Sequence, residues 1–134
     1  MTVVDTSVIV ASFASWHELH SIADATIDSK QLAIGHAIIE SYSVLTRLPL
    51  PHRAPPNLVQ EYINDRFPKP YLVLTGNELA TFIESLPSLK IHGGSTYDAL
   101  IAMTAKQFGH QLITCDSRAI PVYDAIGVEY ITLS

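Results

Sequence analysis

The sequence of 134 residues is short of cysteine, charge and long apolar runs, and each shortage excludes a class of protein. A single cysteine, Cys115, excludes a disulfide framework within the chain, and its apolar neighbours predict a buried, inert thiol. No stretch approaches the run of about 18 apolar residues that a membrane-spanning helix needs. The N-terminus shows no basic region followed by an apolar one, so no secretion signal is predicted and we expect a cytoplasmic location.

Basic residues are also scarce. The chain has 8 Lys and Arg against 13 Asp and Glu, a net charge of −5, whereas nucleic-acid-binding proteins usually carry a basic excess. Acidic residues that gather to bind divalent ions would weaken this objection, because the ions themselves become the phosphate-binding charges. With 48% hydrophobic and 16% charged residues, the composition predicts a globular protein, and the length favours one domain spanning residues 1–134.

Apolar periodicity predicts strands that alternate with helices along the chain. The expected strands are 2–4, 31–34, 71–74, 111–115 and 128–133. The expected helices are 8–14, 19–27, 36–48, 57–67, 77–86, 95–109 and 117–125, with Asn57, Asn77 and a capping box from Ser95 to Asp98 at the starts of three of them. This order predicts an α/β fold, a three-layer α/β/α sandwich with a mostly parallel central sheet.

Two acidic residues directly follow predicted strands. Asp5 ends the first strand and Asp116 ends the fourth, and the carboxyl ends of parallel strands form the edge at which such sheets bind ligands. We therefore expect both carboxylates to open onto one crevice. Capping of the following helix is an equally simple role for each of them.

Two further acidic residues lie near predicted helix starts. Asp98 fits the acidic position of the capping box that begins at Ser95, which gives it an alternative structural role. Glu40 lies among apolar neighbours, and the nearest partner of opposite charge on its helix is Arg47, two turns away. For Glu40, an ion pair and a functional role both stay open.

The four acidic residues together suggest more than each one alone. Two carboxylates about 4 Å apart repel by roughly 4 kcal/mol at an effective dielectric constant of 20, so a cluster takes up either protons or cations. Ligands that are all oxygen favour hard ions such as Mg²⁺ or Mn²⁺ over zinc. A divalent metal site formed by Asp5, Glu40, Asp98 and Asp116 is therefore expected.

Four segments resemble the PIN-domain ribonucleases, and most closely the VapC-type toxins of prokaryotic toxin–antitoxin systems. These segments are 3–8 (VVDTSV), 40–47 (ESYSVLTR), 97–102 (YDALIA) and 112–116 (LITCD). The resemblance covers the whole chain, and it implies that Asp5, Glu40 and Asp98 are the core metal-binding acids, with Asp116 as the fourth. It also implies that Thr6, Ser7 and Thr114 supply hydroxyls near the ions.

The same resemblance implies an endoribonuclease, a type II toxin that pairs with a VapB-type antitoxin and forms a homodimer, with transfer or ribosomal RNA as the expected substrate. Arg47 and Arg118 are the best-placed cations for RNA phosphates and Lys106 is a weaker one, although a surface role is open for all three. His36, four residues before Glu40, is a departure from the family pattern. Contact with substrate or metal is one role open to it, but we expect a hydrogen-bonded structural residue there.

Two other kinds of function stay open. A flavodoxin-like binding domain also gathers acids at its sheet edge, but this chain has no glycine-rich phosphate loop after its first strand. A PIN-like domain without catalysis, kept for binding a partner, is the other alternative. The helices 57–67 and 79–86 are either partner surfaces or part of the core.

Overall fold

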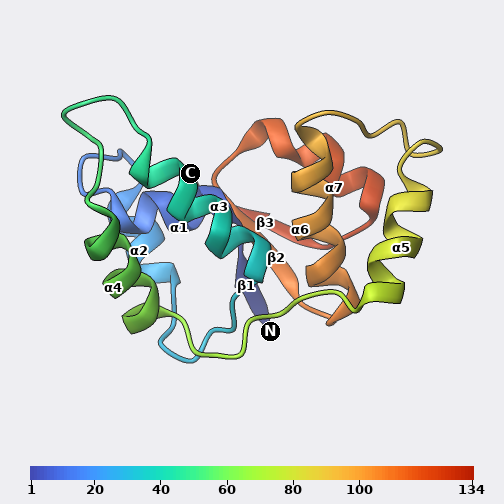
Figure 1. Cartoon of the computed structure of the whole chain (residues 1–134), viewed down its shortest axis with the longest axis horizontal. Helices are drawn as coiled ribbons and strands as arrows, with labels where there is room; N and C mark the ends of the chain where they lie inside the picture. The colour runs from blue at the N-terminus through green and yellow to red at the C-terminus, as the bar shows by residue number, and fades with distance from the viewer.

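A parallel sheet of three strands lies at the centre of the molecule in the computed structural model, which describes all residues from 1 to 134 (Figure 1). Its strands are β1 (Thr2–Val4), β2 (Gln111–Thr114) and β3 (Tyr130–Thr132), in that spatial order. The register places Leu112 of β2 between Val3 and Tyr130. The strand in the middle of the sheet therefore comes from late in the sequence.

Helices lie on both sides of this sheet. They are α1 (Thr6–Phe13), α2 (His20–Thr26), α3 (Gly35–Thr46), α4 (Pro56–Arg66), α5 (Gly76–Ser85), α6 (Ser95–Gln107) and α7 (Ile120–Ile126), with a short 3-10 helix, η1 (Ser117–Ala119), before α7. Figure 1 shows α1 to α4 on one side of the strands and α5 to α7 on the other. The predicted α/β sandwich with a parallel sheet is confirmed. No helix combines the length and the apolar character that crossing a membrane would require.

The two predicted middle strands are reduced to one isolated bridge, between Ile34 and Leu72. Leu72 exchanges backbone hydrogen bonds with the residues that flank Ile34, at 2.8 and 2.9 Å. Helix α3 begins at Gly35, so the first segment has no residues left for a longer ladder. A Cβ at Gly35 would lie 2.9 Å from the Val73 side chain, so only glycine allows these segments to approach so closely. The predicted count of five strands was wrong for this reason.

Three predicted helix caps were also wrong. Helix α4 begins at Pro56, so Asn57 lies inside its first turn. Helix α5 is capped by Thr75, whose side chain forms a reciprocal capping box with Glu78, instead of by Asn77. Helix α6 has Gly94 at its N-cap and no side-chain capping bond, so the capping box from Ser95 does not exist. In each case the N-cap lies earlier in the chain than the expected polar residue.

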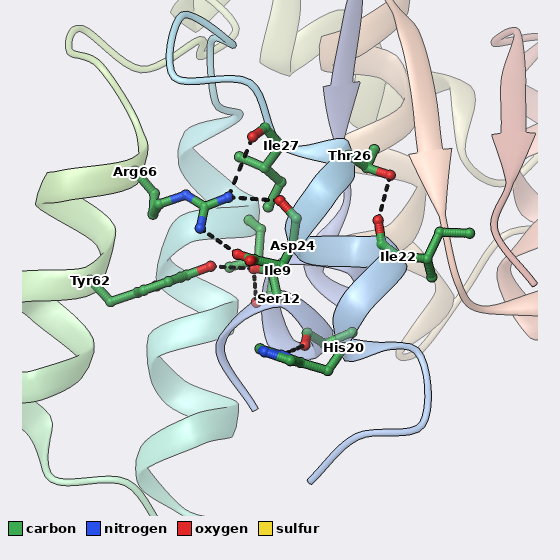
Figure 2. Close-up of polar contacts among 10 residues, drawn as sticks. Ile9, Ser12, His20, Ile22, Asp24, Thr26, Ile27, Tyr62 and Arg66 are labelled. Carbon is green, nitrogen blue, oxygen red and sulfur yellow. Dashed lines mark hydrogen bonds and ion pairs between the residues drawn. The ribbon is translucent and has the colours of Figure 1, made fainter. Parts of the chain in front are cut away.

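One hydrophobic cluster of 30 buried residues runs from Val3 to Val128 and joins all layers. Helix α4 is fixed to α1 and α2 by polar contacts as well, as Figure 2 shows. The Tyr62 hydroxyl lies 2.6 Å from the Ser12 hydroxyl, and Arg66 donates to the carboxylate and the backbone carbonyl of Asp24. These bonds join α1, α2 and α4 to one another.

Candidate active site

The site lies at the carboxyl edge of the sheet, where β1 and β2 end side by side. The backbone N–H of Asp5 donates to the Ile113 carbonyl at 3.0 Å and so extends the pairing of these strands by one step. Asp116 follows the end of β2 by two residues. The sheet therefore brings together two acids that are 111 positions apart in the sequence.

A cavity of about 350 Å³ opens at this edge. It is lined by Asp5, Thr6, Ser7, Val10, His17, Glu40, Val44, Asp98, Ile101, Cys115, Asp116, Arg118 and Tyr123. All four predicted acids are among these residues, and they come from four separate parts of the fold: the end of β1, helix α3, helix α6 and the end of β2. The cavity is open enough for a ligand to enter from solvent, because Asp116 and Glu40 keep about a third of their side chains exposed.

Asp5 is the most enclosed of the four acids, with 3% of its surface exposed. One carboxylate oxygen accepts from the Ser7 hydroxyl at 2.5 Å and from the Val8 N–H at 3.2 Å, and the other accepts from the Tyr123 hydroxyl at 2.7 Å. The bond to Val8 makes Asp5 the N-cap of α1, as the structural alternative predicted. Burial raises the pKa of Asp5 above its ordinary value, although these hydrogen bonds act in the opposite direction.

A chain of hydroxyls connects Asp5 to the end of β2. Ser7 donates to Asp5 and accepts from the backbone N–H of Cys115 at 2.8 Å. Thr114 is fully buried, and its hydroxyl accepts from the backbone N–H of Asp116 at 3.0 Å. Ser7 therefore touches both the cavity and the neighbouring strand, whereas Thr114 stands behind the cavity and fixes the turn into Asp116.

Asp98 carries the clearest electrostatic signal of a shared site. Its pKa rises to about 6, first because of burial and then because of the negative charges of Glu40, Asp116 and Asp5, in that order. The absence of a capping bond at the start of α6 also removes its structural alternative. The other three carboxylates therefore lie near enough to Asp98 to disfavour its ionisation, which is the condition under which a cation is favoured there.

The predicted cations separate into different locations. Arg118 lines the cavity and lies 3.4 Å from Asp116, with 92% of its side chain exposed. Arg47 is exposed at the end of α3, one turn beyond Val44, and donates to the Ser43 hydroxyl. Lys106 lies outside the cavity, where its ammonium donates to the Ile126 carbonyl at 2.9 Å and so caps α7.

His36 does not form the hydrogen bond that we expected from its position. Its Nε2 is buried without a partner and lies 3.6 Å from a Glu40 carboxylate oxygen, beyond hydrogen-bond distance. The ring stacks on Tyr97 with centroids 5.3 Å apart and planes 5° from parallel. The stack connects α3 to α6, the helices that carry Glu40 and Asp98.

Sequence reasoning did not identify Tyr123 or His17, both of which line the cavity. Tyr123 lies on α7 with no recognisable motif around it, and His17 lies in the loop after α1. The Nδ1 of His17 accepts from the Leu19 N–H at 3.0 Å, which leaves Nε2 as the nitrogen that carries a proton. Cys115 was predicted to be buried, but it is half-buried at the cavity wall, because it follows the end of β2. Burial and the charge of Asp5 raise its pKa to about 11, which keeps it a thiol.

The donor set fits a hard divalent ion that keeps part of its water shell. No three His, Cys, Asp or Glu side chains are arranged to hold one ion by themselves. Mg²⁺ does not need such a cage, because it is usually bound by one or two carboxylates together with water and substrate phosphates. The Thr6 hydroxyl is buried at the cavity without a hydrogen-bond partner, and it adds another oxygen to the wall.

Comparison with known proteins gives a family for this arrangement. Residues 2–125 match the PIN domain family model. The chain is 43% identical over 129 residues to Ribonuclease VapC40 of Mycobacterium tuberculosis, found in two strains, and the match covers 96% of each chain. It is 36% identical to Ribonuclease VapC27 of the same organism, over 96% of this chain and 93% of that protein.

Proposed function

We propose that this chain, which belongs to the PIN-domain family and within it to the VapC-type ribonucleases, is an endoribonuclease that hydrolyses RNA phosphodiester bonds with Mg²⁺ or Mn²⁺. One observation carries the metal-dependent part of this proposal. Four carboxylates from distant parts of the chain line a single cavity, and the pKa of one of them, Asp98, is raised first by burial and then by the negative charges of the other three. A divalent cation relieves that repulsion.

A bound divalent ion supplies a Lewis acid that activates water and offsets the charge that develops on the phosphate. Asp5 and Asp98 are the proposed principal ligands, since Asp5 is fixed by three hydrogen bonds and Asp98 is the acid on which the charges of the other three act. Glu40 and Asp116 complete this site or hold a second ion. As the more exposed acids, they are also placed to accept a proton from the attacking water.

The remaining polar groups around the cavity have supporting roles in this proposal. Arg118 is positioned to pair with an RNA phosphate at the open side of the cavity. Arg47 is positioned to pair with another phosphate farther along the RNA chain. Ser7 joins the ends of β1 and β2 through its contacts with Cys115 and Thr114, and Thr114 fixes the turn into Asp116, so together they set the spacing between Asp5 and Asp116. Thr6 offers a hydroxyl at the metal site.

The test is cleavage of an end-labelled RNA by purified protein with Mg²⁺, Mn²⁺ or a chelator. We expect internal cleavage that needs the metal and is lost in Asp98→Asn, while Asp65→Asn retains it. Asp65 is a suitable control because it is an exposed acid on α4, away from the cavity. Full activity of a folded Asp98→Asn protein would overturn the proposed site. No cleavage by the folded wild-type protein would favour the alternative of a PIN-like binding domain without catalysis.

We also propose that the chain acts in the cytoplasm as the toxin of a type II pair with a VapB-type antitoxin, that it forms a homodimer, and that its substrate is transfer or ribosomal RNA. An apolar groove of about 480 Å³ between α3 and α4, which includes Ile39 and Tyr42, supports a protein partner on this side. Ile39 is 69% exposed, which is unusual for its residue type.

Light scattering of the chain alone measures the homodimer, and light scattering with a co-expressed antitoxin measures the toxin–antitoxin complex. Mapping of RNA ends after brief expression identifies the substrate.

A further inference from the structure

The only tryptophan of the chain is half exposed, in a loop. Trp16 lies between α1 and α2 with 49% of its surface exposed, and its ring packs against His52, in the loop between α3 and α4. The ring centroids are 4.2 Å apart and the planes are tilted by 32°. Figure 1 shows these two loops together at the upper left, beyond the ends of α1 and α3. The Trp16–His52 pair therefore lies outside the hydrophobic core and presents an aromatic surface to solvent.

This pair adjoins the carboxylate cavity. His17 follows Trp16 directly and lines the cavity, and the centroids of these two rings are 6.0 Å apart. On the other side, Glu40 and Val44 are one turn apart on α3 and both line the cavity. Helix α3 ends two residues after Val44, and the loop that follows carries His52. A polymer that leaves the cavity along α3 therefore meets the Trp16–His52 pair.

Charge favours a polyanion at this end of an otherwise acidic protein. The sequence has no Asp or Glu between Glu40 and Glu61, and the same stretch contains Arg47 and Arg53, both exposed. Each of these arginines makes one hydrogen bond within the protein, to Ser43 and to the Leu48 carbonyl respectively, so N–H groups are left for other partners. Glu18 is the one acid next to the pair in the sequence.

We propose that the Trp16–His52 pair binds an unstacked base of single-stranded RNA, while Arg47 and Arg53 contact the phosphates that lead into the carboxylate cavity. This inference rests on the proposed ribonuclease function and names the form of its substrate. Single-stranded RNA is bound by stacking its bases on aromatic side chains beside a positively charged path. A base-paired strand keeps its bases inside the helix and cannot stack in this way.

The test uses the intrinsic fluorescence of Trp16, which reports on this position alone because the chain has no other tryptophan. An unstructured RNA oligonucleotide is titrated into Asp98→Asn protein in chelator, so that binding is measured without cleavage. We expect saturable quenching by the single strand and much weaker quenching by a duplex of the same sequence. No quenching at concentrations at which labelled RNA binds, or equal quenching by the duplex, overturns the inference.

Variants in the same background separate base stacking from a purely structural contact between the loops. Trp16→Ala is expected to weaken binding of a labelled single strand by about 5- to 100-fold, the usual cost of losing one base–aromatic stack. Trp16→Phe keeps an aromatic face and is expected to recover most of that loss. Phe108→Ala is the control, because Phe108 is an aromatic residue with 44% exposure at the far end of α6, away from Asp98.

The inference would be overturned if Trp16→Ala bound the labelled single strand as tightly as the protein that retains Trp16. It would also be overturned if Trp16→Phe bound the single strand no more tightly than Trp16→Ala. The cleavage assay tests the proposed function separately. With otherwise wild-type protein, Trp16→Ala is expected to raise KM and leave kcat nearly unchanged, since the pair binds a base at a distance from the reacting phosphate. Absence of RNA cleavage by the wild-type protein would refute the proposed nuclease function. The fluorescence titration would still decide whether the Trp16–His52 pair binds a base.

Discussion

At the scale of single residues, Asp5 combines two roles that sequence reasoning treats as alternatives. Its backbone extends the pairing of β1 with β2, one carboxylate oxygen caps α1, and the other accepts from Tyr123. All of these contacts fix the carboxylate at the cavity wall in one orientation. A substitution at Asp5 therefore disturbs the start of a helix as well as the site, and Asp98 is the better position for testing the chemistry.

Tyr123→Phe is expected to weaken Mn²⁺ binding by about 10- to 100-fold, the range typical of losing a hydrogen-bond partner behind a metal ligand. The reason is that the hydroxyl orients Asp5 through a bond of 2.7 Å. Paramagnetic resonance of free Mn²⁺ measures the affinity without any RNA. The matched control is Tyr130→Phe, which loses a hydrogen bond to the surface residue Asp124. Equal affinity in the two variants would refute a positioning role for Tyr123.

The raised pKa of Asp98 leads us to expect that the stability of the metal-free protein depends on pH. This pKa is about 6 in the folded protein against 3.8 for an unperturbed carboxyl, so between these values the folded state binds more protons than the unfolded state. Stability therefore decreases as the pH rises from about 4 to 6, and this component disappears in Asp98→Asn. Thermal melting in chelator at several pH values measures the effect. Parallel pH profiles for the two proteins would contradict it.

The residue scale also shows what the sequence could and could not predict. Asp5 and Asp116 could be predicted from their positions after strands, because the topology of a parallel sheet determines where strand ends meet. Glu40 and Asp98 stood near helix starts with structural alternatives open, and it was the family resemblance that placed them in the same group. Tyr123 and His17 were not found, since no local pattern reveals that a residue of α7 or of the loop after α1 turns toward the cavity. Their place depends on packing between elements that are distant in the sequence.

At the scale of elements, helix α5 was predicted correctly but its N-cap residue was not. Thr75 and Asn77 are both good capping residues, and only the structure shows that the reciprocal bonds between Thr75 and Glu78 close the helix. The choice depends on where the preceding segment, held by the bridge at Leu72, turns into the helix. That turn is a tertiary feature, so local propensity cannot determine it.

Thr75→Ala is expected to lower the free energy of unfolding by about 1 kcal/mol, because it removes the side-chain acceptor of the capping box. Asn77→Ala is expected to cost little, since Asn77 lies inside the first turn and makes no capping bond. Urea unfolding of the two variants measures the difference. A larger loss for Asn77→Ala would show that the helix begins where the sequence pattern suggested.

Helix α4 offers a second test at this scale. Tyr62→Phe removes the hydroxyl contact with Ser12, which joins α4 to α1, and is expected to cost about 1 kcal/mol of stability. The loss should be absent when Ser12 is already replaced by Ala, apart from the cost of the replacement itself. A double-mutant cycle with urea unfolding therefore measures the coupling. Additive effects of the two substitutions would show that this bond contributes nothing.

At the scale of the whole molecule, one continuous core from Val3 to Val128 predicts a single cooperative unfolding unit over residues 1–134. Trp16 fluorescence reports from the loop after α1, and circular dichroism reports from all helices. The two unfolding curves in urea are expected to coincide. A shifted fluorescence curve would mean that the helices on the left of Figure 1 unfold separately from the rest.

The order of the strands has a consequence for synthesis of the protein. The strand on which both edge strands pair, β2, is translated after six of the seven helices, and Asp116 follows it. A nascent chain that has just completed α6 contains Asp5 but lacks both β2, the strand that pairs with β1, and Asp116. Because the carboxylate cavity needs β2 and Asp116, we expect a nascent chain that lacks them not to cleave RNA.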